Sequence, residues 1–105
     1  MSVVTVYAVF ANADEAGRIG RAMVEEKLAA CVNLLGGIRS IYRWQGKTED
    51  STEFAALFKT SSAVADRLIT RIAELHSYAV PCVESWPATQ ALERYADWVE
   101  DNIAG

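Results

Sequence analysis

The stretch ACVNLLGGIRSIYRWQGKTEDSTEFAALFK, residues 30–59, decides the fold of this chain. Its first half has the residue types of an extended chain, and Gly36-Gly37 interrupts it in the way that predicts a bulge or bend. Gln-Gly-Lys at residues 45–47 predicts a hairpin turn, and residues 52–59 alternate as a returning strand. Such a long hairpin has edges that need covering, which is a first indication that the chain associates with others.

The segments on either side of the hairpin alternate between strands and helices. Residues 3–10 are almost all β-branched or aromatic, as in a buried strand, and residues 79–86 predict a short edge strand with prolines near both ends. Apolar stripes of helical spacing follow Asn12, follow Ser62 and close the chain, and Asn12 and residues 60–62 offer helix caps. The sequence therefore predicts one α+β domain over residues 1–105. Its expected plan is a ferredoxin-like βαββαβ sandwich with an antiparallel sheet, a long hairpin between the second and third strands, and a C-terminal helix.

Composition narrows the classes of function. The formal net charge is -4, from 10 Lys and Arg against 14 Asp and Glu, so binding to nucleic acid or to an anionic membrane is not expected. The first residues lack the features of a secretory signal, and no apolar run approaches the length that spans a bilayer. These features predict a soluble, cytoplasmic protein.

Three side chains could hold a soft metal ion. Cys31 and Cys82 are candidate thiolate ligands, and His76 is the single histidine of the chain. Each also has a simpler interpretation: the cysteines as small buried side chains, and His76 as a charged residue in the last turn of a helix. A site made of these three requires the fold, or a second subunit, to bring them together.

Two further groups allow a functional and a structural interpretation. Glu49, Asp50 and Glu53 can bind a hard cation or take part in acid–base chemistry, or they can form a solvated edge. Residues 59–62, Lys-Thr-Ser-Ser, can hold an anion at a helix start, although simple capping is the preferred interpretation. The aromatic residues, Trp44 and Tyr78 among them, fit a core or a subunit interface equally well.

Several short segments together resemble the CutA family. EEKLAACVN at residues 25–33 is similar to the family signature, and residues 40–53 follow its S-x-Y-x-W-x-G-K-x-E-x-x-x-E spacing. Lys59-Thr60 and the H-x-Y-x-x-P of residues 76–81 match in the same order along the chain. One departure concerns a metal site, because Cys82 stands where the family usually has Glu after that proline.

The resemblance implies a ferredoxin-like homotrimer with a cytoplasmic role in divalent-cation tolerance, copper above all. It also implies a cleft between subunits, near which the matched side chains lie: Cys31, Trp44, Lys47, Glu49, Glu53, Lys59, His76 and Tyr78. We therefore expect a trimeric, metal-binding tolerance protein with Cys31, His76 and Cys82 as candidate ligands, and no enzymatic activity. The alternative is a signalling or scaffold trimer, similar to PII proteins, that binds a small anion or a protein partner in the cleft. A third hypothesis, an enzyme that uses Glu53 and His76 as acid and base, has no nucleophile or cofactor motif to support it.

Overall fold

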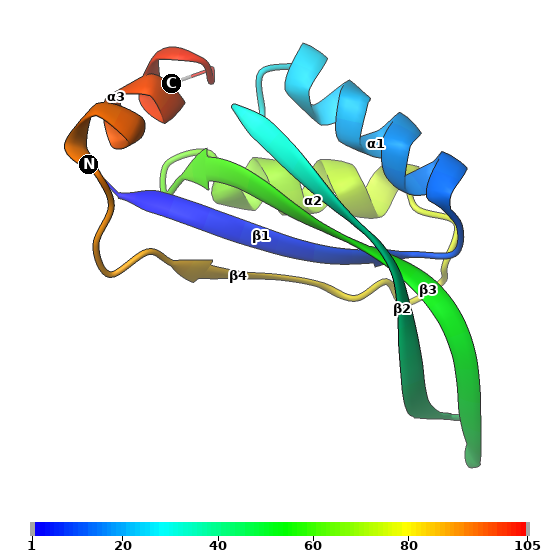
Figure 1. Ribbon diagram of the computed structural model, residues 1–105. Helices are drawn as coiled ribbons and strands as arrows, with labels where there is room; N and C mark the ends of the chain where they lie inside the picture. Colours follow the sequence, from blue (N-terminus) through cyan, green and yellow to red (C-terminus); the bar gives the residue numbers. More distant parts are fainter. Residues whose placement is uncertain (1, 105) are drawn as a thin grey trace.

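The computed structural model describes residues 2–104 and has the predicted order of elements. These are β1 (Val3–Phe10), α1 (Ala13–Glu25), β2 (Cys31–Trp44), β3 (Lys47–Ser61), α2 (Ala65–Leu75), β4 (Val83–Pro87) and α3 (Glu93–Asp101). The strands form one antiparallel sheet in the order β2-β3-β1-β4, which confirms the ferredoxin-like plan. Helices α1 and α2 lie together on one face of the sheet, while the β2–β3 hairpin runs beyond its end (Figure 1).

The main core lies between the sheet and the two helices. The β1 residues Val6, Ala8 and Phe10 face the helices and are fully buried, because alternate residues of a strand point to the same side. They pack against the predicted apolar stripes of α1 and α2, including Ile19 and Leu68. At the other end of the sheet, Val99 of α3 and Ile103, which follows that helix, are buried in a smaller cluster. The apolar stripes predicted for α1 and α2 are therefore confirmed as core faces.

The hairpin is longer than the sequence predicted. Gln45 and Gly46 form its turn with φ values of 51° and 79°, the positive values that a two-residue turn of the primed type needs. Strand β3 therefore begins directly at Lys47, where the polar segment that follows pairs with the last residues of β2. These first residues of β3 are mostly polar, so they lack the apolar alternation that would predict a strand. The predicted bulge is confirmed, since Leu34 and Gly36 pair with consecutive residues of β3.

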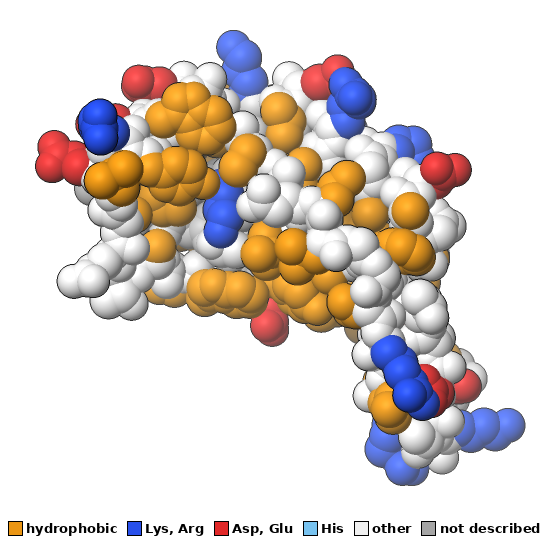
Figure 2. Space-filling model, in the orientation of Figure 1, with side chains coloured by type: hydrophobic (Ala, Val, Ile, Leu, Met, Phe, Trp, Pro, Cys, Tyr) orange, Lys and Arg blue, Asp and Glu red, His pale blue; other side chains and the backbone are white. Residues whose placement is uncertain are grey.

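One sheet face is left uncovered by the helices of its own chain. Figure 2 shows apolar side chains gathered over the strands on this open face, with charged side chains at the tip of the hairpin. Large aromatic side chains on this face that remain exposed include Tyr42 and Trp44, which line its hollow, and Trp86, whose ring lies 6.0 Å from that of Tyr7. The sequence-based expectation that this face needs a cover therefore applies to the folded chain.

The helix caps and the start of the last strand agree only in part with the predictions. Asn12 caps α1 as predicted, because its Oδ1 accepts a 2.8 Å hydrogen bond from the Glu15 amide. The predicted caps at residues 60–62 are wrong: β3 continues to Ser61, and α2 begins after Val64 without a side-chain cap. The last strand begins at Val83, four residues later than predicted, because Pro81 has no N–H to donate to a strand ladder.

Candidate functional site

A cavity of about 690 Å³ lies at the root of the hairpin, on the open face of the sheet. Its aromatic walls come from three places in the chain: Tyr7 on β1, Tyr42 and Trp44 on β2, and Tyr78 in the segment after α2. Tyr7 reaches the cavity because it alternates with the core residues of β1 and points away from the helices. The volume suits a small molecule.

The one acidic side chain that lines the cavity is Glu53 of β3. Glu53 is only 7% exposed, and its Oε2 accepts a 2.7 Å hydrogen bond from the hydroxyl of Tyr78. Burial, followed by this hydrogen bond and the charge of Glu53, raises the pKa of the Tyr78 phenol. The cavity lining contains no lysine, arginine or histidine, so the carboxylate has no basic neighbour there. The arrangement suits a ligand that brings its own positive charge.

His76 holds the wall segment that carries Tyr78. The carbonyl oxygen of Val9 lies 2.7 Å from Nε2 of His76 and can only accept, so Nε2 donates. Nδ1 accepts a 3.0 Å hydrogen bond from the Tyr78 amide, and the ring stacks on Phe10 with 5.0 Å between centroids. His76 is the C-cap residue of α2, with Nε2 as hydrogen-bond donor and Nδ1 as acceptor. It therefore lies one position beyond the last helical turn in which it was predicted.

Glu15 anchors the same segment from the other side. Its side chain is 5% exposed and accepts hydrogen bonds from the amides of Ala11 (3.2 Å) and Ser77 (3.0 Å). Burial alone would raise the pKa of Glu15, but these hydrogen bonds outweigh it and the pKa falls below its ordinary value. The sequence indicated only a favourable charge at a helix start, because nothing local to Glu15 shows that residue 77 returns to it.

The structure does not bring the two cysteines together. Cys82 lines the cavity, and burial together with the charges of Glu84 and Glu53 raises the pKa of its thiol. Cys31 lies on the outer strand β2 at the level of Lys59, 3.8 Å from the Tyr95 hydroxyl. Cys82 precedes the opposite outer strand β4 and is level with Val9, whereas Cys31 is level with Thr5, so the two cysteines are separated across the sheet by about 14 Å and also along the strands.

The three soft-metal candidates therefore do not meet within one chain. Among residues 2–104, no group of three His, Cys, Asp or Glu side chains is placed to hold a metal ion. Both ring nitrogens of His76 are already hydrogen-bonded to backbone groups. A metal site built on these residues would need a donor from a second subunit.

The remaining predicted cleft residues are spread along the hairpin and β3. Trp44, Glu53 and Tyr78 line the cavity, whereas Lys47 and Glu49 are exposed near the hairpin tip. Lys59 lies further along β3 and donates a 2.9 Å hydrogen bond to Oγ1 of Thr5.

The acidic side chains of Glu49, Asp50 and Glu53 do not form a cluster in the folded chain. Asp50 pairs with Arg39 across the hairpin at 2.6 Å, whereas Glu53 is buried in the cavity. The sequence missed Tyr7 and Tyr42 as cavity residues because only the strand register shows that they converge with Glu53.

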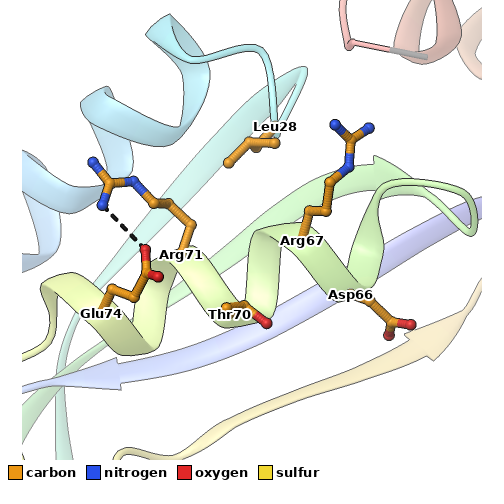
Figure 3. A pocket seen from close by; sticks show the side chains of 6 residues that line it. All are labelled: Leu28, Asp66, Arg67, Thr70, Arg71 and Glu74. Atoms are coloured by element: carbon orange, nitrogen blue, oxygen red, sulfur yellow. Dashed lines mark hydrogen bonds and ion pairs between the residues drawn. The ribbon is translucent and has the colours of Figure 1, made fainter.

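A second hollow, of about 360 Å³, lies on the outer face of α2. Figure 3 shows Leu28 above it, with Arg67 and Arg71 rising from the helix and Glu74 paired to Arg71. Arg71 binds both Glu74 (3.2 Å) and Glu26 (2.9 Å), and Arg67 donates to a backbone carbonyl. Since its two arginines already have partners, this hollow is a weaker candidate than the cavity around Glu53.

The helices of residues 2–104 include none with the length and apolar character needed to cross a membrane.

Comparison with known proteins shows a consistent likeness. The sequence profile of the family described as CutA1 divalent ion tolerance protein matches residues 4–102. The divalent-cation tolerance protein CutA of Archaeoglobus fulgidus is 36% identical over 98 residues, covering 93% of this chain and 95% of that protein. The protein of the same name from Thermus thermophilus is 42% identical over 84 residues, covering 80% of this chain and 82% of its own length.

Solved structures agree with the sequence comparison. CutA from Xylella fastidiosa superposes with a TM-score of 0.95 at 35% identity, covering 99% of this chain and all of that one. The Archaeoglobus fulgidus structure, described as a periplasmic divalent cation tolerance protein, has a TM-score of 0.93 at 34% identity and covers 97% of this chain and 99% of its own.

Proposed function

This chain belongs to the CutA1 family of divalent ion tolerance proteins, and from that membership we propose that it acts in copper tolerance as a metal-binding homotrimer. The match over residues 4–102 is the observation that carries the proposal. The further steps, that the cation is copper and that it is bound directly, are supported by the two cysteines, because thiolates are soft ligands. The proposed location is the cytoplasm, although the Archaeoglobus fulgidus relative is described as periplasmic.

The homotrimer is supported by the uncovered face and by the hairpin. Trp44 lies on the open face and Ile41 on the opposite side of the hairpin; they are 44% and 63% exposed, and neither contributes to the core of its own chain. A hairpin with exposed apolar side chains on both sides is typical of a segment that another subunit covers. A second subunit would also supply the donors that one chain does not bring together.

We propose a binding protein and not an enzyme. His76 has both ring nitrogens engaged by backbone groups, so it must break a hydrogen bond before it can accept a proton from a substrate. Glu53 accepts a hydrogen bond from Tyr78 and lines the cavity, whereas His76 is absent from the cavity lining. A role in holding the cavity wall accounts for the contacts of His76.

Copper titration of single variants tests the ligand assignment. We expect Cys82→Ser to weaken copper binding more than Cys31→Ser, because Cys82 lies exposed at the cavity whereas Cys31 contacts Tyr95. Cys→Ser preserves size and removes the soft donor, and Asp97→Asn serves as a control on the surface of α3. Unchanged copper affinity in both cysteine variants would contradict the thiol assignment and leave the family assignment intact.

The alternative of a small-anion site in the cleft has weaker support. Lys47 and Lys59, the basic residues that it would use, do not line the cavity, and Glu53 would repel an anion there. A ligand-sensing role for the cavity therefore favours a ligand of the opposite charge.

A further inference from the structure

We propose that Lys47 of the partner subunit neutralises the carboxylate of Glu53, entering the cavity at the root of the hairpin when a second copy of the chain covers the open face. This pairing rests on the homotrimer proposed above and identifies the two side chains that join one copy to the next. Three features of the single chain support it. Glu53 is buried without a cation, Lys47 is a free amine on the same side of the sheet, and the two are too far apart to meet within one chain.

Glu53 is a buried carboxylate that its own chain does not neutralise. The residue is only 7% exposed, and the hydrogen bond that it accepts comes from the neutral hydroxyl of Tyr78. The ion pairs among residues 2–104 occupy Asp50, Glu26 and Glu74. A buried carboxylate costs free energy unless a cation or several donors compensate it. A second subunit over this face removes the remaining water, so the covering surface has to bring the compensating charge.

The strands of the sheet present two amines to the open side, and both belong to β3. Directly paired residues share a side, so Lys47 lies on the side of Trp44, which lines the cavity. Lys59 is an even number of residues from Lys47 and therefore points the same way. The strand arginines Arg39 and Arg43 are an odd number of residues from Trp44 and point to the helix side. A second copy can therefore offer Lys47 or Lys59 from its open side.

Of these two amines, Lys47 is the one available to a partner. Lys59 is half-buried and donates a 2.9 Å hydrogen bond to Oγ1 of Thr5, a residue that is only 6% exposed. Lys47 is exposed directly after the turn of a hairpin that runs beyond the end of its own sheet (Figure 1). None of the ion pairs among residues 2–104 includes Lys47. The hairpin therefore carries a free amine away from its own domain and toward a neighbouring molecule.

The distance between the two groups makes the contact one between copies. Lys47 and Glu53 are six residues apart on one strand, which is about 20 Å at the usual rise and beyond the reach of a lysine side chain. A contact between them joins the hairpin tip of one copy to the hairpin root of the next. Such a head-to-tail contact, repeated around a cyclic assembly, closes into a ring. In a trimer each copy then gives one lysine and receives one.

The cavity suits a lysine side chain. Its volume is about 690 Å³, and Tyr7, Tyr42 and Tyr78 place aromatic rings in the same lining as Glu53. The apolar ring faces can pack against the methylene groups of a lysine, and they attract the ammonium group toward the carboxylate. The covering subunit would thereby fill the hollow and supply its missing charge together.

A double-mutant cycle on the purified assembly tests the pairing. Analytical ultracentrifugation in moderate urea gives the dissociation constant of the assembly for Lys47→Met, alone and combined with Glu53→Gln. We expect Lys47→Met to raise this constant at least about tenfold alone, because it leaves a buried carboxylate unpaired, and less than about twofold in the Glu53→Gln background. Glu53→Gln still accepts the Tyr78 hydrogen bond, and Lys47→Arg keeps the charge and should assemble as the wild type does. Effects of two sites about 20 Å apart in one chain should add, so coupling between them reports a contact between copies.

Lys59→Met is the matched control, because Lys59 points to the same side of β3 and is also six residues from Glu53. Its effect on the dissociation constant should be equal with and without Glu53→Gln. A trimer in which Lys47→Met has equal effects in both backgrounds would overturn the pairing and leave the homotrimer intact. Coupling of Glu53 to Lys59, or of Lys47 to Glu49 in place of Glu53, would overturn it in the same way. A wild-type protein that sediments as a monomer would contradict the homotrimer itself, and the pairing with it.

Discussion

The hydroxyl of Tyr78 donates a 2.7 Å hydrogen bond to Oε2 of Glu53, which lies 25 residues earlier in the chain. His76 positions Tyr78 for this contact. Its Nδ1 accepts a hydrogen bond from the Tyr78 backbone N–H, and its Nε2 donates one to the carbonyl oxygen of Val9. A hydrogen-bonded series from β1 through His76 to Tyr78 therefore sets the position of the cavity wall relative to β3.

Tyr78→Phe should destabilise the protein by about 1–3 kcal/mol, because it removes the donor from a buried carboxylate while keeping the ring. The free energy of unfolding is measured by urea denaturation at one fixed protein concentration. Tyr42→Phe is the matched control, since the Tyr42 hydroxyl is exposed and its hydrogen bond to Ser51 Oγ is long, at 3.4 Å. Equal losses of unfolding free energy in the two variants would show that the hydrogen bond to Glu53 stabilises the protein no more than the exposed Tyr42 contact does.

The stability supplied by Tyr78 should disappear at alkaline pH. Its pKa is raised above the ordinary value of 10.0, so the folded state holds this proton more tightly than the unfolded state does. The contribution is complete below pH 10.0 and decreases as the pH rises through the folded-state pKa. The difference in unfolding free energy between wild type and Tyr78→Phe, measured from neutral to strongly alkaline pH, should therefore shrink. A difference that grows with pH would contradict the direction of the shift.

Glu15 should show the opposite dependence, at acidic pH. Its pKa is lowered from 4.5, so its stabilising contribution is present above that value and is lost as the pH falls through the folded-state pKa. Glu15→Gln should destabilise the protein at neutral pH, because a side-chain amide cannot accept both backbone N–H groups as well. The gap between wild type and variant should narrow on acidification. Glu25→Gln, on an exposed position of α1, should change the unfolding free energy by less than about 0.5 kcal/mol.

Ile41→Lys should weaken the assembly without unfolding the chain. Ile41 is 63% exposed and belongs to neither core cluster, so a charge there costs the isolated chain little. Light scattering should report a smaller mass at low protein concentration, with an unchanged far-UV circular dichroism spectrum. Ile41→Val keeps the apolar surface and should retain the wild-type mass. A wild-type mass for Ile41→Lys would place the interface elsewhere.

The fold could be predicted because its main features are local in sequence. The apolar stripes of α1 and α2 and the β-branched run of β1 each mark their own element, and Gly46 marks the hairpin turn. The errors occurred where tertiary pairing overrides local preference. Residues 60–62 have capping side chains, yet β3 continues to Ser61 because Val3 pairs with that residue.

The site was less predictable because it depends on contacts between distant segments. Trp44, Glu53 and Tyr78 were predicted together through the family resemblance, and all three line the cavity. The resemblance did not distinguish them from Lys47, Glu49 and Lys59, which lie outside it. Lys47, Glu49, Glu53 and Lys59 all point to the same side of β3, and only Glu53 is level with the distant segment that carries Tyr78. That position along the strand is not readable from side-chain type alone.

Native mass spectrometry during copper titration tests the central claim most directly, because it reports assembly and metal uptake in one experiment. Three chains of 11.5 kDa should give a particle of about 34.5 kDa that gains about one copper per chain at low copper excess. A monomer of 11.5 kDa, or a trimer that stays free of copper at high excess, would contradict the proposed metal-binding homotrimer.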